Sequence, residues 1–237
     1  MFTLFFVSPQ ELDNSEIEIS GSQGRHAISV LRVSVGESIR LANGLGGWVD
    51  GEIINITRDV VRVQVKARGE DKKPRVRISV AQALLKGDNQ KLAIDQLVQA
   101  GVASIIPWRA TRSVGTTDKT EKWREVISTA AKQSRRSLLP EIMNLIDLKS
   151  LVDTFSQYSI VIALHESATI NLASIPSIAQ AESILLIVGP EGGLTDVELD
   201  TLSSMNAIVV KMGDPVIRAD LAGSLALAAT NALVGNW

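Results

Sequence analysis

The chain has 237 residues, of which 45% are hydrophobic and 21% charged, an ordinary composition for a globular protein and a length that predicts two domains. It contains no cysteine and two histidines, which excludes disulfides and thiolate chemistry and argues against a zinc site. No apolar run approaches the roughly 20 residues needed to span a bilayer. Residues 2–7 lack the basic flank and the length of a signal peptide. We therefore expect a metal-free cytoplasmic protein without a membrane segment.

The formal net charge of −2 conceals an uneven distribution. Residues 1–136 carry 21 Lys and Arg against 15 Asp and Glu, whereas residues 137–237 carry 3 against 11. A basic front half indicates a polyanionic partner, although a solvated charged surface would give the same composition. The cations gather at residues 58–77 and 109–136, and phosphate contacts from such clusters give salt-dependent affinity for nucleic acid.

Residues 1 to about 68 consist of short β-forming runs separated by polar and glycine-rich turns, which predicts a small all-β barrel. A polar stretch with one proline at residues 69–75 predicts the linker to a second domain. The strands expected in the first domain are residues 2–7, 38–42, 48–56 and 59–67.

Beyond the linker, strand patterns alternate with helical ones, which predicts an α/β domain with a mostly parallel sheet covered on both faces. The expected strands are residues 76–85, 103–108, 159–164, 183–188 and 207–211. The expected helices are residues 88–100 and 119–137, one that starts at Thr195, and residues 219–234.

One loop of the second domain is the most informative segment. The apolar run 185–188 ends at Gly189-Pro190-Glu191-Gly192-Gly193, and Thr195 with Glu198 three residues later predicts a capping box that starts a helix. Three glycines leave the backbone open to a ligand and permit positive φ. Such a loop, at the carboxyl end of a strand, is where open α/β folds bind ligands.

Two further strand ends carry comparable loops, at residues 164–167 and 212–218. In a parallel sheet the three loops would meet at one crevice, although each alone would also suit a tight turn. The glycine-lysine-serine/threonine of a P-loop and the dinucleotide fingerprint are both missing. Glu191 would repel a phosphate and suits a neutral or cationic ligand such as a sulfonium. Alternatively, Glu191 caps neighbouring backbone N–H groups.

No activated nucleophile is evident in the sequence. His165, at a strand end, is a candidate general base or a hydrogen-bonding structural residue. Arg218 opens the last helix at its positive end, where a cation is mildly disfavoured, and this placement hints at function.

Taken together, these segments resemble the bacterial 16S rRNA (uracil-1498-N3)-methyltransferase family, of the knotted SPOUT class. The match runs through the whole chain, and its specificity lies in the order of the motifs. They are Arg25-His26-Ala27-Ile28-Ser29-Val30-Leu31-Arg32-Val33, Asn43-Gly44, Gln82-Ala83-Leu84-Leu85-Lys86-Gly87-Asp88, Ala100-Gly101-Val102, Ile106-Pro107, Thr111-Arg112-Ser113, Ala131-Lys132-Gln133-Ser134-Arg135-Arg136 and Gly189-Pro190-Glu191-Gly192-Gly193.

The resemblance implies an RNA-binding PUA-like β-barrel at residues 1–70. It also implies a methyltransferase domain at residues 75–237, with a deep trefoil knot that forms the S-adenosylmethionine pocket. It further implies a homodimer that methylates N3 of a uridine in the 16S rRNA of the small ribosomal subunit. The cofactor-binding residues implied by position are Leu164, His165, Glu166, Val188, Gly189, Pro190, Gly192, Gly193, Met212, Gly213, Val216, Ile217 and Leu225.

On this interpretation, Arg218 is the candidate cation for an anionic uracil, and Glu191 and His165 are candidates for proton handling. The candidates for RNA contact are Arg25, Arg32, Arg62, Lys66, Lys86, Arg112, Arg135 and Arg136.

The sequence departs from the family where the last helix begins. The usual Leu-Arg-Thr-x-Thr-Ala is here Ile217-Arg218-Ala219-Asp220-Leu221-Ala222, without either threonine. Two alternatives therefore stay open: a non-catalytic RNA-binding protein that kept the fold, and a knotted methyltransferase that acts on a ribose hydroxyl or on another base.

Overall fold

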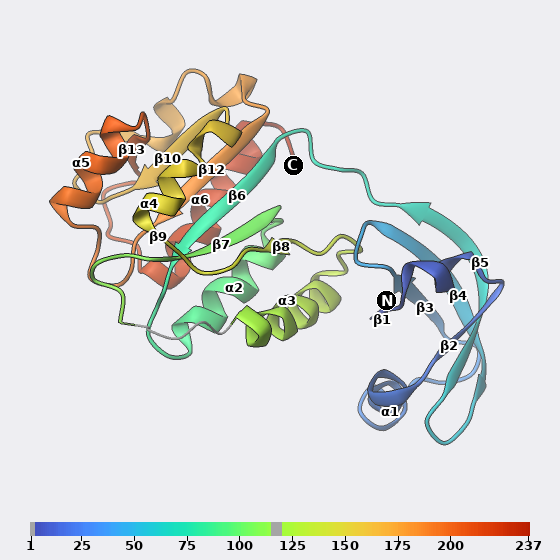
Figure 1. Cartoon of the computed structure of the whole chain (residues 1–237). Coiled ribbons are helices and arrows are strands. Elements are labelled where there is room, and N and C mark those ends of the chain that lie inside the picture. The colour runs from blue at the N-terminus through green and yellow to red at the C-terminus, as the bar shows by residue number, and fades with distance from the viewer. Residues whose placement is uncertain (1–2, 115–119) are drawn as a thin grey trace. The chain divides into compact units, whose positions relative to one another are not determined.

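The computed structural model describes residues 3–114 and 120–237, which form two compact units (Figure 1). One unit contains the chain up to Lys73 together with Ala131–Leu139, and the other contains Pro74–Ala130 and Pro140–Trp237. The expected boundaries had placed residues 131–139 in the second domain. They pack with the first because Leu138 bridges Gly44 and Leu45, and because the Ser137 N–H donates to the Asp71 carboxylate at 3.0 Å.

The first unit is built on a five-stranded sheet in the order β1-β3-β4-β5-β2. Its β1–β3 pair is parallel and the other pairs are antiparallel. Apolar side chains such as Phe5, Leu41, Ile53 and Val63 fill its core. The elements are β1 (Thr3–Phe6), a 3-10 helix (Pro9–Asp13), β2 (Glu16–Ile19), α1 (Gly21–Ser29), β3 (Ser38–Ala42), β4 (Gly47–Ile56) and β5 (Val61–Glu70).

The all-β expectation for this unit is wrong at α1. The helix buries only Gly24 and Ala27, so its sequence has no apolar stripe of helical period to reveal it. The strand expected at residues 59–67 is confirmed as β5, with Val61 and Val63 buried and Arg62 and Lys66 exposed.

The second unit contains an eight-stranded sheet whose described pairs are all parallel, in the order β11-β13-β10-β12-β6-β7-β8, with β9 also beside β7. The predicted parallel sheet is thus confirmed. The strands are β6 (Arg77–Ala83), β7 (Ser104–Arg109), β8 (Glu141–Ile142), β9 (Ile146–Asp147), β10 (Ile160–Leu164), β11 (Ile170–Asn171), β12 (Ser183–Val188) and β13 (Ile208–Lys211).

Alternate residues of the central strands point to opposite faces of the sheet. Both faces are apolar and both are covered by helices (Figure 1). Leu185 and Ile187 of β12 pack with Leu151 of α4 and Leu202 of α5, whereas Val188 contacts α6 on the other side. The helices are α2 (Asn89–Gln99), α3 (Thr120–Ser134), α4 (Leu148–Asp153), α5 (Asp196–Ser204) and α6 (Ala219–Leu233), and three 3-10 helices span Phe155–Gln157, Leu172–Ser174 and Ile178–Gln180.

Strand order determines where a ligand site can form. Strand β10 lies between β12 and β13, so the loops that follow all three strands leave the same edge of the sheet side by side. After β13, the chain returns as α6 and packs against α2, β6 and β12. In the part of the chain that the structure describes, no helix is both long and apolar enough to cross a membrane.

Candidate active site

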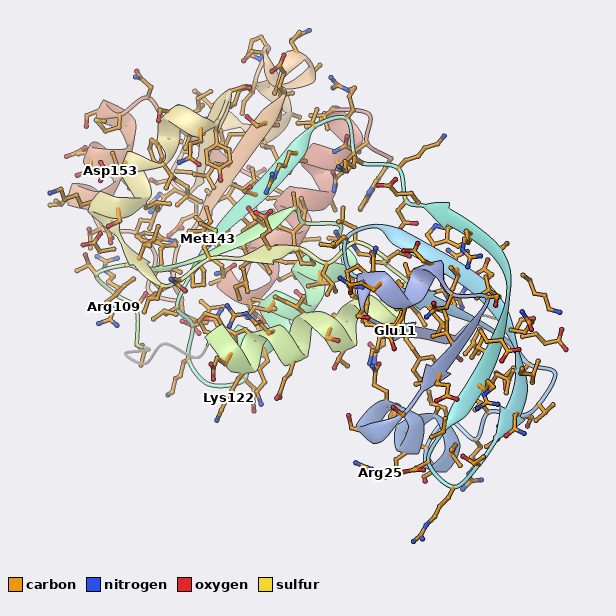
Figure 2. All side chains as sticks on the ribbon, turned by 45° about the vertical axis from the view of Figure 1, so that its right-hand side comes forward. Glu11, Arg25, Arg109, Lys122, Met143 and Asp153 are labelled. Atoms are coloured by element: carbon orange, nitrogen blue, oxygen red, sulfur yellow. The ribbon has the colours of Figure 1, made fainter. Side chains whose placement is uncertain are left out.

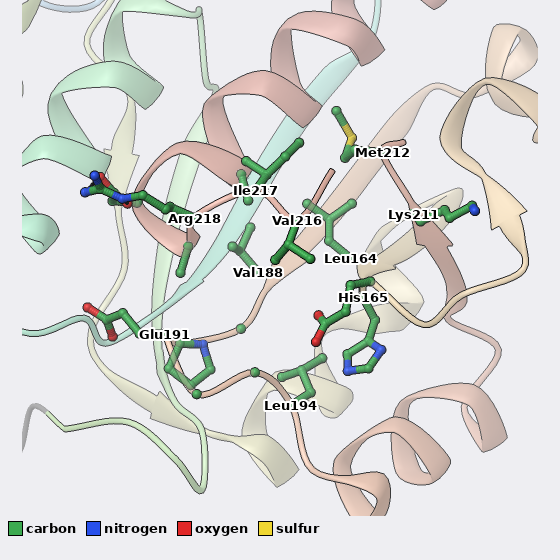
Figure 3. Close-up of a pocket in the computed structure, with 18 of the residues that line it drawn as sticks. Leu164, His165, Val188, Glu191, Leu194, Lys211, Met212, Val216, Ile217 and Arg218 are labelled. Carbon is green, nitrogen blue, oxygen red and sulfur yellow. Dashed lines mark hydrogen bonds and ion pairs between the residues drawn. The ribbon is translucent and has the colours of Figure 1, made fainter. Parts of the chain in front are cut away.

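A cavity of about 410 Å³ opens at the carboxyl ends of β10, β12 and β13 (Figure 3). Its walls come from the three predicted loops, which therefore do converge, together with Asn89 from α2 and the first turn of α6. Every residue expected to hold the cofactor lines it except Leu225, which lies on α6 outside the cavity and is 40% exposed. The cavity is also lined by residues outside the three predicted loops, namely Asn89, Leu194, Val210, Lys211, Ala219, Asp220 and Ala222.

The glycines of the loop 189–193 serve different purposes. Gly193 has a φ of +70° and donates its N–H to Pro190 O at 2.9 Å, which closes a tight turn. Gly192 lies close to Arg112, because a Cβ there would be 3.2 Å from Arg112 Cβ, a contact tight enough that the arginine would have to move. The expectation that these glycines leave the backbone free for a ligand is thus incomplete, since Gly192 also makes room for an arginine of the chain itself.

The predicted capping box is confirmed at the start of α5. Thr195 Oγ1 accepts the Glu198 N–H at 3.2 Å, and Glu198 Oε2 accepts the Thr195 N–H at 2.8 Å. Glu198 is only 2% exposed, and its other oxygen accepts the Thr111 N–H at 2.7 Å. Burial by itself would raise the pKa of Glu198, but the hydrogen bonds from Thr195 and Thr111 outweigh it and lower the pKa. A buried anion therefore joins α5 to the loop after β7.

Glu191 connects two loops at the cavity rim. Its Oε1 accepts the Lys86 N–H at 3.0 Å and the Asn89 side-chain amide at 3.1 Å, so the alternative of backbone capping is confirmed. Burial opposes the ionised form, but these bonds and the Lys86 charge prevail and lower the pKa of Glu191. The carboxylate also lines the cavity, and its negative charge favours a cationic ligand there.

His165 makes local structural contacts. The ring Nδ1 lies 2.8 Å from Ser167 Oγ and accepts the Ser167 N–H at 3.3 Å, while the backbone N–H of His165 donates to Val210 O at 2.9 Å. Figure 3 shows His165 at one end of the cavity, and Arg218 and Glu191 at the other. The three catalytic candidates therefore do not converge on one point.

Arg218 is the N-cap of α6 and pairs with Asp220 in the first turn of the helix. Its Nε and Nη2 donate to the two carboxylate oxygens at 3.0 and 2.8 Å. The Asp220 side chain is 6% exposed and that of Arg218 73%. Asp220 supplies the negative charge that a helix N-terminus favours, which explains how a cation is tolerated there. A guanidinium has five N–H donors, so three remain for a substrate.

Some of the candidate RNA contacts already bond to other groups of the chain, although Arg62, Lys66 and Arg112 are exposed as well. Arg62 pairs with Glu18 at 2.6 Å, Lys66 lies 3.5 Å from Glu52, and Arg112 donates to Gly192 O at 2.8 Å. Burial lowers the pKa of Arg136, against the opposing influence of Asp71. The remaining candidates have exposed side chains, and Arg25 projects from the outer side of α1 (Figure 2). They are Arg25, Arg32, Lys86 and Arg135.

Comparisons with known proteins agree with this architecture. A model of an RNA methyltransferase domain matches residues 71–231, and one of an RNA methyltransferase PUA domain matches residues 19–66. The ribosomal RNA small subunit methyltransferase E of Mycobacterium tuberculosis is 32% identical, over 99% of this chain and 93% of that protein. The enzyme of the same name from Bacillus subtilis is 27% identical, over 92% of this chain and 93% of that protein.

Solved structures give the same result. A Legionella pneumophila methyltransferase in complex with the cofactor S-adenosylmethionine superposes with a TM-score of 0.85 at 25% identity, over 98% of both chains. The Neisseria gonorrhoeae ribosomal RNA small subunit methyltransferase E, bound to S-adenosylmethionine, shares the fold with a TM-score of 0.88 at 22% identity, over 98% of both chains. The chain thus belongs to the RNA methyltransferase family that includes the ribosomal RNA small subunit methyltransferases E.

Proposed function

We propose that this chain transfers a methyl group from S-adenosylmethionine to N3 of a uridine at the 1498-type position of 16S rRNA. The observation that carries the proposal is the cavity of about 410 Å³ formed by the loops after three adjacent parallel strands. Its size suits a small-molecule site, and Glu191 gives it the negative charge that favours a sulfonium. The relatives solved with S-adenosylmethionine support the same cofactor.

The residues present fit such a cofactor. Backbone groups of the loops 164–166, 188–193 and 212–217 line the cavity and would hold the adenosine, since close backbone approach needs small side chains or none. When bound, S-adenosylmethionine supplies an electrophilic methyl group on sulfur. The three loops would hold that methyl in line with the attacking nitrogen, and such positioning supplies much of the catalysis.

Arg218 would act on the uracil. As N3 forms its bond to the methyl carbon, the bond from that carbon to the sulfonium sulfur would break and release S-adenosylhomocysteine, and the imide proton would pass to solvent. Negative charge would develop on the uracil carbonyl oxygens as the proton leaves. The Arg218 donors that Asp220 does not use can bind those oxygens. Because N3 lies on the pairing edge, the target base must be unpaired or flipped out of its helix.

The proposal also includes the trefoil knot, the homodimer and the cellular location of the protein. The chain after β13 returns to β6 and β12 as α6, a path that supports the trefoil knot implied by the family resemblance. We further propose that the protein works as a homodimer and acts on the small ribosomal subunit in the cytoplasm, because that is where the proposed substrate resides.

Nucleoside analysis tests this function. The purified chain is incubated with S-adenosylmethionine and with small subunits from a strain that lacks its gene, and the rRNA is digested and separated. We expect 3-methyluridine at one site. Another methylated nucleoside would favour a knotted methyltransferase of different specificity. The absence of both methylation and calorimetric S-adenosylmethionine binding would leave a non-catalytic RNA-binding protein.

A further inference from the structure

Arg112 is a candidate RNA contact in the sequence. We propose that it is instead a positioning residue that holds the glycine loop 189–193 in its cofactor-binding conformation. The inference rests on the proposed function, since it concerns the same cavity. It assigns an arginine of the loop after β7 to the binding of S-adenosylmethionine, although its side chain does not line the cavity.

The first contact is direct. Arg112 Nη1 donates to Gly192 O at 2.8 Å, and Gly192 is one of the cavity walls. The aliphatic part of the arginine packs close to the same residue: a Cβ built at Gly192 would be 3.2 Å from Arg112 Cβ and 3.3 Å from its Cδ. Arg112 therefore restrains the loop by both a hydrogen bond and close packing.

Two neighbouring contacts fix the strand and loop from which Arg112 projects. The Thr111 N–H donates to the buried Glu198 carboxylate at 2.7 Å, and Trp108 Nε1 donates to Val188 O at 3.1 Å. Trp108 is fully buried. Positions 108, 111 and 112 thus bond, respectively, to the last residue of β12, to α5 and to the glycine loop. The first and the last of these partners line the cavity, and α5 begins shortly after the glycine loop in the chain.

These contacts have a role that the sheet cannot fill. Strands β7 and β12 are not neighbours, because β6 lies between them. Pairing with β6 fixes the spacing of the two strands, but the loops that follow them make no ladder pair with each other. The contacts of Trp108, Thr111 and Arg112 past β6 connect those loops directly. A loop with three glycines has unusual freedom to lose on ordering. Holding it in place beforehand lowers the cost of ligand binding.

Calorimetry in the absence of RNA tests the proposal. Full-length Arg112→Ala is expected to bind S-adenosylmethionine about tenfold more weakly, which corresponds to about 1.4 kcal/mol. Arg112→Lys is expected to recover part of this loss, because an ammonium can still donate to Gly192 O. The control is Lys149→Ala, at an exposed position on α4, which should bind like the wild type.

If Arg112 only stabilises the fold, or only binds RNA, other results are expected. If Arg112→Ala binds S-adenosylmethionine with wild-type affinity but binds rRNA less tightly, the proposal is overturned. A melting temperature that falls enough to account for weaker binding would overturn it as well. Failure of the wild-type chain itself to bind S-adenosylmethionine would instead refute the proposed function.

A double-mutant cycle sharpens the test. Gly192→Ala puts a methyl group against the Arg112 side chain, so it should also weaken cofactor binding. Because both substitutions disturb the same contact, the double variant Gly192→Ala/Arg112→Ala should lose less affinity than the sum of the two single losses. Strict additivity would show that Arg112 does not act through Gly192.

Discussion

At the scale of single residues, the function depends on how each charge in the cavity wall is bonded. Arg218 at the N-terminus of α6 is an unfavourable placement when only the sequence is considered. The structure supplies the compensation, because Asp220 receives two hydrogen bonds from the guanidinium and is nearly buried. The pair aims Arg218 and neutralises part of its charge, so the two residues should behave as one unit.

We predict that Arg218→Ala lowers the single-turnover rate of methyl transfer by about 100-fold, a loss typical of removing a donor that stabilises developing negative charge. Asp220→Asn should lower the rate by about tenfold, because an amide accepts only one of the two bonds. S-adenosylmethionine affinity, measured by calorimetry, should change less than threefold in both. Wild-type rates for Arg218→Ala would remove this residue from the chemistry.

Glu198 predicts a pH dependence of stability. Its hydrogen bonds lower the pKa in the folded state below the ordinary 4.5, so the folded chain gains stability wherever the carboxylate is ionised. That gain is present above the unfolded pKa and is lost as the pH falls through the folded pKa. Urea unfolding between about pH 6 and 3 should therefore show a shallower acid dependence for Glu198→Gln than for the wild type. Equal slopes would contradict the buried-anion assignment.

How much of the site could be predicted depends on how far apart its partners lie in the chain. The capping box of Thr195 and Glu198 spans three residues, and it was predicted and is confirmed. The bonds from Glu191 to Lys86 and from Arg112 to Gly192 join residues 105 and 80 positions apart. No local pattern encodes them. Asp220 was visible beside Arg218, but its burial depends on how α6 packs.

At the scale of elements, periodic patterns predicted the long strands and helices and missed the short ones. Strand β12 and helix α6 were expected within one residue of their observed ends, because each buries a long apolar run. Helix α4 and the two-residue strands β8, β9 and β11 are too short to show a period, and helix α1 buries too few apolar residues. On α2, Leu92 is 42% exposed, whereas Ala93 and Ile94 are buried.

The start of α5 gives a prediction at this scale. Thr195→Ala removes the side-chain cap of the helix, which should lower the free energy of unfolding by about 1 kcal/mol. Because Glu198 also loses the hydroxyl donor at 2.9 Å, cofactor affinity should fall as the loop before α5 loosens. Ser204→Ala, at the other end of α5 and exposed, is the control for chemical denaturation and should differ from the wild type by less than about 0.5 kcal/mol.

At the scale of the whole molecule, the segment Ala131–Leu139 changes the charge of the first unit. It brings Lys132, Arg135 and Arg136 and no acidic residue. Without it, the chain up to Lys73 carries 9 Lys and Arg against 10 Asp and Glu. The segment is held in place in part by Lys132, which donates to Gln23 Oε1 at 3.0 Å and whose pKa burial lowers. The basic character of the first unit therefore depends on a segment from the middle of the chain.

The exposure and pairing of the cations in the first unit predict which of them bind RNA. Arg25 and Arg135 are exposed, whereas Arg62 is already paired with Glu18. Arg25→Ala and Arg135→Ala should each weaken binding to small subunits and reduce the salt slope of log affinity by about one unit, as expected for the loss of one phosphate contact. Arg62→Ala should reduce the salt slope less, because the Arg62 guanidinium would have to leave Glu18 before it could bind a phosphate. Filter binding over a range of salt concentrations measures all three, with S-adenosylmethionine affinity as the control that should stay constant. A slope that falls as much for Arg62→Ala as for Arg135→Ala would show that RNA outcompetes Glu18 for the guanidinium.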